Sequence, residues 1–554
     1  MTPNTTDLFH GTPRFREKPL APGSTSEGWA ALLDRHGPAG APAQVQGDFA
    51  VAMMRADGSI FMAVDRFAIR TLCYRIDQGQ IRFASRADEL AEASDDLDLQ
   101  ALFDYLYFHI IPSPRTAFAG VHRLPPGHYA VFKDGLLTVA PYWVPRFQPE
   151  PGRSFQQWQD EFKPLMQAAV AQQYDGSRAA CFLSGGTDSS TVAGMLAATA
   201  GQQVTCYSIG FEAEGYDEMA YARIAAKRFG CAHHEIYFTP EDLVRDIPQV
   251  AAAYDQPFGN SSALPSFHCA QFAKADGVTR ILAGDGGDEL FGGNSRYATQ
   301  RLFGFYRQVP GVLRKGLLEP IFGMGWVGRT PGLKKGTGYI RQANTPLPDR
   351  AQAFNLLGRL GYSEVLTPAM RARVNEASVL QQQRDVWAEA QCSDELNRYL
   401  AYDWRYTLAE CDLPKVVGTT SLAGVDVGFP MLDDALVDFS MRLPAEYKLK
   451  GMQLRWFFKE ALRGFLPDEI LTKKKQGFGL PFGVWMVRHA GLKKLSGDGL
   501  HSLAQRGIVN PAFVRQLIEQ RLPEHPHYYG TMVWILLMLE HWLRHHRPNF
   551  RLQA

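Results

Sequence analysis

The strongest constraint on the fold is a regular alternation of strand-like and helical patterns between residues 154 and 293. The apolar run "AACFLS" is typical of a short buried strand. The segment after it, "DSSTVAGMLAATAG", has a helical pattern with Asp188 near its start and Gly201 at its end. "VTCYSIGF", "HHEIYF" and the start of "TRILAGDGGDELFGG" are further strand patterns, separated by helical segments. Strands that alternate with helices predict a parallel sheet covered on both faces, and the chain from about residue 300 onward is mostly helical in pattern.

The first 145 residues or so have a different pattern, rich in short strands. "GDFAVAMMRADGSIFMAVDRFAIRTLCYRIDQGQIRFAS" contains apolar runs separated by Asp-Gly and Gly-Gln turn signals, and "RLPPGHYAVFKDGLLTVAPYW" repeats this with a Lys-Asp-Gly turn. This pattern favours an antiparallel meander or sandwich. "PRFQPEPGRS" then supplies the Pro and Gly of a linker near residue 150.

Charge and composition disfavour nucleic-acid binding, membrane attachment and secretion. The 554 residues carry 58 Lys and Arg against 57 Asp and Glu, so the chain has no single-sign field to attract nucleic acid or an anionic membrane, although a local basic patch can hide in such a balance. The N-terminal residues show no signal-peptide pattern, and no apolar run approaches the ~18 residues of a membrane span. Seven cysteines, with no Cys-x-x-Cys pair, fit reduced thiols. We expect a soluble cytoplasmic protein with no nucleic-acid or membrane partner.

The stretch "CFLSGGTDSS" places small and polar residues directly after a predicted strand. Ligands of open parallel sheets bind beyond the carboxyl ends of the strands, and glycines with free helix N–H groups suit an anion. The loop is therefore built to hold phosphate. Asp188 cannot contact phosphate directly, because a carboxylate beside a phosphate needs a cation between them, and Mg²⁺ is the natural one. The loop lacks the Gly-Lys-Ser/Thr ending of a Walker A motif.

A second glycine-rich loop, "AGDGGDELFGG", follows another predicted strand. Asp288 in this loop is a candidate second Mg²⁺ ligand, since one carboxylate rarely holds the ion alone. The competing interpretation of each loop is a turn with no ligand, and the presence of both loops at compatible strand ends disfavours it.

The first loop matches the Ser-Gly-Gly-x-Asp-Ser pattern of ATP pyrophosphatases, which cut ATP between the α- and β-phosphates. Over nearly its whole length the chain also resembles the class B asparagine synthetases and their relatives. This resemblance rests on "LSGGTDSS", "YSIGF", "GDGGDELFGG", "FPMLDDALVDFSMRLP", "FFKEALRGFLPDEILTKKKQGFGLPFGVW" and the N-terminal "VQGDFAVAMMRADGSIFMAVDRFAIRTLCYRI".

The resemblance implies an α/β protein with two domains. Residues 1–148 would form a degenerate glutaminase-like domain, a β-sandwich of the N-terminal-nucleophile hydrolase type. Residues 152–554 would form an asparagine synthetase-like ATP-pyrophosphatase domain, adenine nucleotide alpha hydrolase-like, with a parallel sheet and a helical C-terminal part. The implied ligands are ATP and Mg²⁺. The implied nucleotide-binding residues are Leu183, Ser184, Gly185, Gly186, Thr187, Asp188, Ser189, Ser190, Ile209, Ala283 and Gly284, and the implied metal ligands are Asp188 and Asp288.

The N-terminal departure from the family concerns the glutaminase. Members that hydrolyse glutamine have cysteine as the second residue, where this chain has Thr2, and its first cysteine is Cys73, inside a predicted strand. The segment before Gly47 is also too short for the family's glutamine-binding loops. We therefore expect no glutamine hydrolysis. Thr2 as an N-terminal nucleophile is the sharper alternative, disfavoured because the rest of that pocket is missing.

Two further departures concern the synthetase region. Val417, Asp426 and Gly428 stand where the family usually has Asp, Glu and Arg, so aspartate is a poor candidate substrate. Arg455 stands where a catalytic lysine is expected. It keeps the positive charge, and the alternatives are that Lys459 or Lys475 does this work, or that Arg455 is only a surface helix cation. Asp285 matches the position of a general base proposed in relatives.

The resemblance and its departures predict an AMP-forming carbon–nitrogen ligase that uses an amine carried by its own substrate. The favoured branch is the lasso peptide cyclases, which form a macrolactam in a ribosomally made peptide, with a leader peptidase and a recognition-element protein as conceivable partners. The alternative is a β-lactam synthetase-like cyclase or another amidoligase acting on a small amino acid. A non-catalytic scaffold is the third hypothesis, and two intact phosphate loops argue against it.

Overall fold

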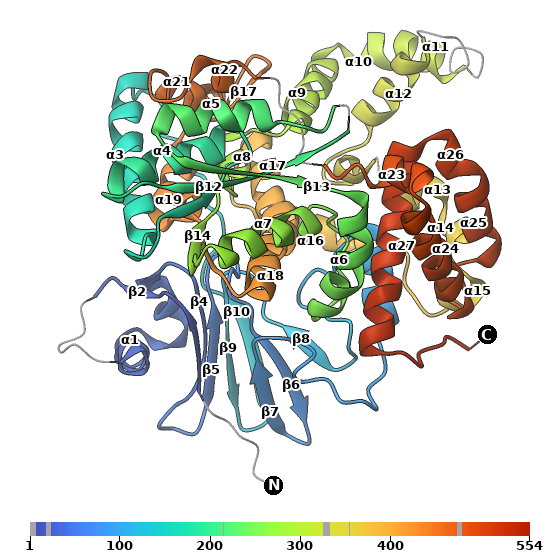
Figure 1. Cartoon of the computed structure of the whole chain (residues 1–554), viewed down its shortest axis with the longest axis horizontal. Helices are drawn as coiled ribbons and strands as arrows, with labels where there is room; N and C mark the ends of the chain where they lie inside the picture. Colours follow the sequence, from blue (N-terminus) through green and yellow to red (C-terminus); the bar gives the residue numbers. More distant parts are fainter. Residues whose placement is uncertain are drawn as a thin grey trace.

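The computed structural model describes residues 7–17, 24–213, 215–324, 333–353, 355–473 and 479–553. Antiparallel strands of the N-terminal part lie at the bottom of Figure 1, a parallel sheet lies above them, and the C-terminal helices lie to the right. The candidate residue Lys475 falls outside the described residues.

The N-terminal part consists of antiparallel sheets, as the turn signals predicted. One sheet has the strand order β1 (Leu8–Gly11), β4 (Phe49–Met54), β5 (Ile60–Val64), β9 (His128–Lys133), β10 (Leu136–Pro141). A second has the order β7 (Gln80–Ala84), β6 (Cys73–Asp77), β8 (Val121–Arg123), and a small pair joins β2 (Arg14–Phe15) to β3 (Val45–Gln46). The predicted turns join β4 to β5, β6 to β7 and β9 to β10.

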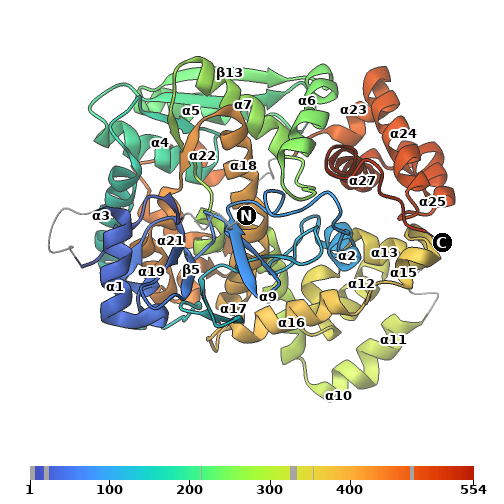
Figure 2. The ribbon, with the colours of Figure 1, turned by 90° about the horizontal axis from the view of Figure 1, so that it is seen from below.

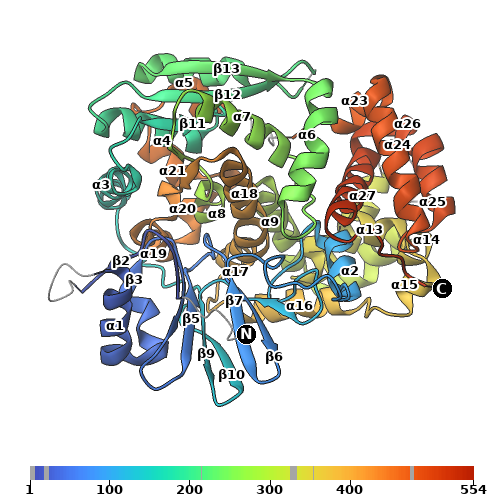
Figure 3. The same ribbon diagram turned by 60° about the horizontal axis from the view of Figure 1, so that its bottom comes forward.

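Alternating side chains make these sheets two-sided. Ala52 and Met62 face Tyr74 and Ile81 of the second sheet in one apolar cluster. The opposite face of the first sheet packs on α1 (Thr25–Gly40), which the sequence analysis did not predict. Figure 3 shows β5, β9 and β10 beside β6 and β7, with α1 on the outer side. Period-two alternation explains why one strand can serve both clusters.

The predicted parallel sheet is present, with helices on its faces. Its strand order is β13 (Ala232–Phe238), β12 (Thr205–Phe211), β11 (Ala180–Phe182), β14 (Arg280–Leu282), β15 (Asp426–Gly428), and every neighbouring pair is parallel. The chain runs outward from β11 to β13 and returns to place β14 on the other side of β11. This reversal is a topological switch point, where open sheets of this type bind ligands.

The predicted helices of this region are present. They are α3 (Phe155–Gln173), which precedes β11, and α4 (Thr187–Thr199), α5 (Met219–Phe229), α6 (Pro240–Ala253) and α8 (Gly287–Phe291). The longer elements of the helical C-terminal region are α16 (Ser378–Glu389), α17 (Glu395–Asp403), α18 (Leu413–Ala423), α19 (Asp434–Arg442), α24 (Ala490–Gln505) and α27 (Pro526–His546). The strand β15 and the helix α7 (Ala263–Ala275), which follows α6, were not predicted. None of the described helices has both the length and the apolar character required to cross a bilayer.

Buried ion pairs connect the N-terminal sheets to the helical region. Glu410 is buried and accepts hydrogen bonds from the Ser113 backbone N–H at 3.1 Å and from the Ser113 hydroxyl at 2.6 Å. It also pairs with Arg123 and with Arg405. Burial opposes the charge of this carboxylate, but Arg123 and Arg405 hold its pKa below the ordinary value. Glu410 is therefore a charged anchor between segments far apart in the sequence.

We expect Glu410→Ala to lower the free energy of unfolding by about 3–5 kcal/mol, because it leaves two arginines without their buried counter-charge. Denaturant titration followed by circular dichroism measures this. Glu519→Ala, at an exposed glutamate, is the matched control and should change stability by less than about 0.5 kcal/mol. Equal stability of the two variants would contradict the anchoring role.

Candidate active site

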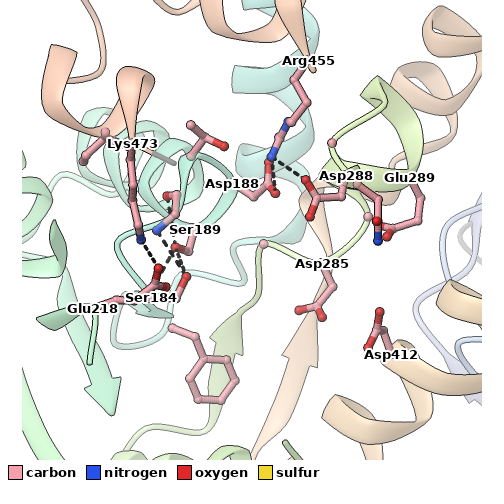
Figure 4. A pocket seen from close by; sticks show the side chains of 18 of the residues that line it. Ser184, Asp188, Ser189, Glu218, Asp285, Asp288, Glu289, Asp412, Arg455 and Lys473 are labelled. Atoms are coloured by element: carbon pink, nitrogen blue, oxygen red, sulfur yellow. Dashed lines mark hydrogen bonds and ion pairs between the residues drawn. The ribbon is translucent and has the colours of Figure 1, made fainter. Parts of the chain in front are cut away.

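Two glycine-rich loops lie side by side at the carboxyl edge of the parallel sheet. Residues 183–186 follow β11 and residues 283–286 follow β14, the two strands that flank the switch point. A cleft of about 940 Å³ opens over them, and its walls come from both loops, α7, α18 and the segment 452–473. Figure 4 shows the polar side chains of this cleft.

The start of α4 has backbone N–H groups that no side chain caps, because the N-cap residue is Gly186. Within the loop before the helix, the Ser184 N–H donates to Ser189 Oγ at 3.1 Å and the Gly186 N–H donates to Ser184 Oγ at 3.3 Å. Gly185 has a φ of +70°, and a Cβ there would lie 2.6 Å from the Ala222 backbone nitrogen, so only glycine fits against α5. Uncapped N–H groups at a helix start suit an anion such as phosphate.

Glycines also let the two loops touch. A Cβ on Gly284 would lie 2.7 Å from the Ser189 nitrogen, and one on Gly287 would lie 2.2 Å from Asp188 Oδ1. A Cβ on Gly293 would lie 1.8 Å from Asp288 Oδ1. The absence of side chains at these positions therefore brings Asp188 and Asp288 to the same point.

Arg455 lies between these two carboxylates. Its Nη1 donates to Asp188 Oδ2 and to Asp288 Oδ1, each at 2.8 Å, and Nη2 forms a second contact with Asp188 (Figure 4). The residue is 5% exposed, has a φ of +57°, and its guanidinium lies 4.3 Å from the centre of the Phe458 ring. The interpretation of Arg455 as a surface helix cation is therefore wrong. Burial lowers its pKa to about 9, which still leaves it charged at neutral pH.

The donor set fits Mg²⁺ in the form that accompanies a nucleotide. Asp188 and Asp288 converge on a single guanidinium, so one cation can contact both, and carboxylate oxygens are its preferred protein ligands. Within the part of the chain that the structure describes, no cluster of three or more metal-binding side chains exists. An ion at this point would have two protein carboxylates as ligands and would take its remaining ligands from phosphates and water.

The other end of the cleft contains a charged group of three that the sequence analysis only partly anticipated. Lys415 Nζ lies 3.2 Å from Asp285 and 3.2 Å from Asp412. Burial raises the pKa of Asp285, although Lys415 opposes that shift. Burial disfavours the charge of Lys415, but Asp412 and Asp285 outweigh it and raise its pKa. This end therefore carries one net negative charge, which suits an amine.

A second cation beside the first loop was also missed. Lys473, 8% exposed at its side chain, pairs with Glu218 at 2.6 Å and lies 4.5 Å from the Tyr221 ring centre. Its Nζ is 3.5 Å from the Gly185 carbonyl oxygen. Lys459 also lines the cleft, and burial together with Arg455 lowers its pKa. The run of lysines at 473–475 was a signal for this cation, but it could not show which lysine faces the loop.

The candidate nucleotide-binding residues divide into lining and supporting groups. The cleft is lined by Leu183, Ser184, Gly186, Thr187, Asp188, Ser189, Ile209 and Gly284, together with Asp285, Asp288 and Arg455. Gly185, Ser190 and Ala283 lie behind this lining; Ser190 and Ala283 are buried. Val417, Asp426 and Gly428, which depart from the family pattern, do not line the cleft. Asp426 pairs with Arg70 and Arg280 at the amino end of β15, and a Cβ on Gly428 would contact Gln173 at 2.8 Å.

Comparison with known proteins gives two matches to family models and several relatives. Residues 161–544 match the asparagine synthase family, and residues 16–143 match a glutamine amidotransferase domain. Asparagine synthetase [glutamine-hydrolyzing] 1 of Bacillus subtilis is 25% identical, over 92% of this chain and 79% of that protein. A putative asparagine synthetase [glutamine-hydrolyzing] of Mycobacterium bovis is 27% identical, over 90% of this chain and 76% of its own length. Amidase chyE of Penicillium rubens is 27% identical, over 85% of this chain and 76% of that protein.

We expect Gly287→Ala to reduce ATP affinity by at least about tenfold, because the added Cβ would displace the Asp188 carboxylate from the contact between the loops. Gly497→Ala is the control, since Gly497 lies in a helix and has open space at its Cβ position. Titration calorimetry with ATP and Mg²⁺ measures both variants. Wild-type affinity in Gly287→Ala, with the fold retained, would contradict the assignment of this contact to nucleotide binding.

Proposed function

Because this chain belongs to the asparagine synthetase family of ATP-dependent carbon–nitrogen ligases, we propose that it activates a substrate carboxylate as an acyl-adenylate. The carboxylate oxygen attacks the α-phosphorus of ATP, and pyrophosphate leaves. An amine then attacks the acyl carbon, an amide bond forms, and AMP and a proton leave. The observation that carries the proposal is the meeting of two glycine-rich loops, with their converging carboxylates, at the floor of a large cleft.

The residues at the floor have distinct proposed roles in this first step. The N–H groups in the first turn of α4 bind the phosphates, and Lys473 lies where it can balance the charge of the leaving pyrophosphate. Asp188 and Asp288 would hold Mg²⁺, which neutralises charge on the phosphates when bound. Arg455 holds the same two carboxylates in this structure, so it must release at least one of them when the metal nucleotide binds. Its guanidinium would then be free to stabilise negative charge on the reacting groups.

We propose that no glutamine is hydrolysed, although the bacterial relatives are named as glutamine-hydrolysing enzymes. Residues 1–148 contain a single cysteine, Cys73, which is fully buried in β6. Burial raises the pKa of this thiol well above its ordinary value, which is the reverse of what a nucleophilic cysteine requires. The N-terminal sheets are instead joined to the synthase region by ion pairs such as Arg70 with Asp426.

Without ammonia from glutamine, the amine belongs to the substrate, and we propose that the substrate is a peptide that becomes a macrolactam. Asp285 and Asp412 would receive the amine, with Lys415 holding both carboxylates in place. The cleft is at the upper end of ordinary ligand pockets, roughly 300–1,000 Å³, which leaves room for peptide beside a nucleotide. The expected loss of charge at Val417 and Gly428 does not support this proposal, because neither residue lines the cleft.

The alternative is ring closure or amide formation on a small amino acid. One fungal relative of similar identity, amidase chyE at 27%, is named as an amidase and not as an asparagine synthetase. The charged group at Asp285, Lys415 and Asp412 could also receive a small amine. The two hypotheses differ in the size of the substrate and not in the chemistry at the floor of the cleft.

We expect a leaderless precursor peptide to lose one water, about 18 mass units, with one AMP formed per cyclised molecule, since condensation through an adenylate requires this stoichiometry. Mass spectrometry of peptides incubated with ATP and Mg²⁺ measures it, with Asp188→Asn as the inactive control. Parallel reactions contain small β-amino acids, aspartate with ammonia, or glutamine. Consumption of a β-amino acid with ATP, and of no peptide, would replace the cyclase by the small-molecule ligase. Glutamate release from glutamine would refute the loss of glutaminase activity.

We expect Arg455→Ala to reduce ligation by about 100-fold and, without nucleotide, to increase the affinity for Mn²⁺, because both carboxylates then lose their internal cation. Arg455→Lys should retain part of the activity. Arg463→Ala is the control, since Arg463 also lines the cleft but pairs with Glu460 at the surface. Paramagnetic resonance of free Mn²⁺ measures binding independently of turnover. Unchanged Mn²⁺ affinity in Arg455→Ala would show that Arg455 does not compete with the metal.

A further inference from the structure

A helical arm projects from the molecule beyond the candidate active site. The arm is formed by residues 295–324 and 333–344, with α9 (Ser295–Gln308), α10 (Gly311–Leu313), the π-helical turn η2 (Arg314–Leu318), α11 (Glu319–Gly323) and α12 (Leu333–Asn344). In Figures 1 and 2 the segment from α10 to α11 lies at the outer edge of the ribbon, away from both sheets.

The arm has a small core of its own and a fixed base. Phe303, Tyr306 and Ile340 are buried together, and Leu318 and Phe322 pack against them from the outer helices. At the base, Arg301 donates to the Leu449 carbonyl oxygen at 2.6 Å, and Arg307 pairs with Glu395. The inner face of the segment from α10 to α11 therefore packs against the small core of the arm.

The outer face of the same segment is apolar and exposed. The exposed fractions are 85% for Val312, 51% for Leu313, 51% for Leu317, 38% for Ile321 and 45% for Met324. Leu313, Leu317 and Ile321 recur every four residues, so they form one stripe along the helix, offset from the inward-facing Leu318 and Phe322. A soluble chain rarely exposes a contiguous apolar stripe of this kind unless a partner covers it.

The arm also concentrates positive charge that the composition of the whole chain conceals. Residues 295–344 contain nine Lys and Arg and a single acidic residue, Glu319, whereas the whole chain has 58 basic and 57 acidic residues. Three of the arginines are already paired: Arg296 with Asp403 and Arg307 with Glu395, both outside the arm, and Arg314 with Glu319. Lys315, next to the apolar stripe, and Arg341 are exposed. Charge complementarity therefore favours a partner that is anionic as well as apolar.

The shape of this surface favours a lipid bilayer over a peptide. A helix or strand that binds a protein usually enters a groove, whereas the cleft of about 940 Å³ and a second cavity of about 400 Å³ near Phe513 are both lined by residues outside the arm. The stripe lies on the outside of a projecting helix. Apolar side chains flanked by Lys and Arg on such a helix are the pattern of interfacial membrane binding, in which the helix lies in the headgroup region without crossing the bilayer.

We propose that the arm binds the surface of an anionic lipid membrane, with Leu313, Leu317 and Ile321 entering the headgroup boundary and Lys315 contacting lipid phosphates. This proposal is independent of the proposed ligase function. It differs from the expectation of no membrane partner, which rested on the near-zero net charge of the whole chain and on the lack of an apolar run long enough to span a bilayer.

The test is co-sedimentation of the full chain with vesicles of phosphatidylcholine alone and of phosphatidylcholine with 30% phosphatidylglycerol. We expect binding to the anionic vesicles, weakening as salt rises, and little binding to the neutral ones. The triple variant Leu313→Ser, Leu317→Ser, Ile321→Ser should bind at least about tenfold more weakly. The single variant Lys315→Glu should mainly reduce the preference for anionic vesicles.

Leu136→Ser is the matched control, because Leu136 is a 76% exposed leucine on β10, far from the arm in sequence. It should bind like the wild type. Circular dichroism and an unchanged denaturation midpoint verify that the triple variant is folded, since its three side chains are exposed. Absence of wild-type binding to anionic vesicles, equal binding to neutral vesicles, or unchanged binding by the triple variant would overturn the proposal. Binding of the arm to an acidic polypeptide and not to vesicles would overturn it as well.

Discussion

The contact between two glycine-rich loops is the constraint on which the candidate active site depends. The backbone around Gly284 and Gly287 comes so close to Ser189 and Asp188 that any side chain would overlap them. This closeness is possible because β14 lies directly beside β11, so the two loops leave the sheet at the same edge. A larger residue at either glycine would separate the carboxylates and leave no common point for a cation.

The electrostatic consequence of this contact is a pair of acidic groups that needs a positive partner. Two carboxylates a few ångströms apart repel each other by about 4 kcal/mol at an effective dielectric constant near 20, and Arg455 removes this repulsion in the structure. A metal nucleotide brings its own cation and its own negative phosphates. Arg455 can then serve first as the counter-ion of the two carboxylates and later as a cation that stabilises negative charge on the reacting groups. One side chain would thus contribute both to the stability of the cleft and to the proposed reaction.

The remaining parts of the molecule surround this floor with different kinds of contact. The charged group at Asp285 and Lys415 forms the opposite end of the cleft, where an acceptor amine would be received. The N-terminal sheets are held to the synthase region by ion pairs such as Glu410 with Arg123, and their one thiol is buried. The arm exposes an apolar, basic surface beyond the cleft. The nucleotide, the amine and the membrane would thus each contact a different part of the molecule: the two loops, the charged group and the arm.

By itself the sequence determined the family, the alternation of parallel strands and helices, the two loops and their acidic residues, because these depend on local patterns. It could not predict β15 or α7, whose places depend on contacts with distant segments. Lys415 and Lys473 were missed for the same reason: a lysine is recognised as a site residue only when its carboxylate partners are known. Only the tertiary structure showed that Arg455 is buried between Asp188 and Asp288, since that pairing joins residues 167 to 267 positions apart in the chain.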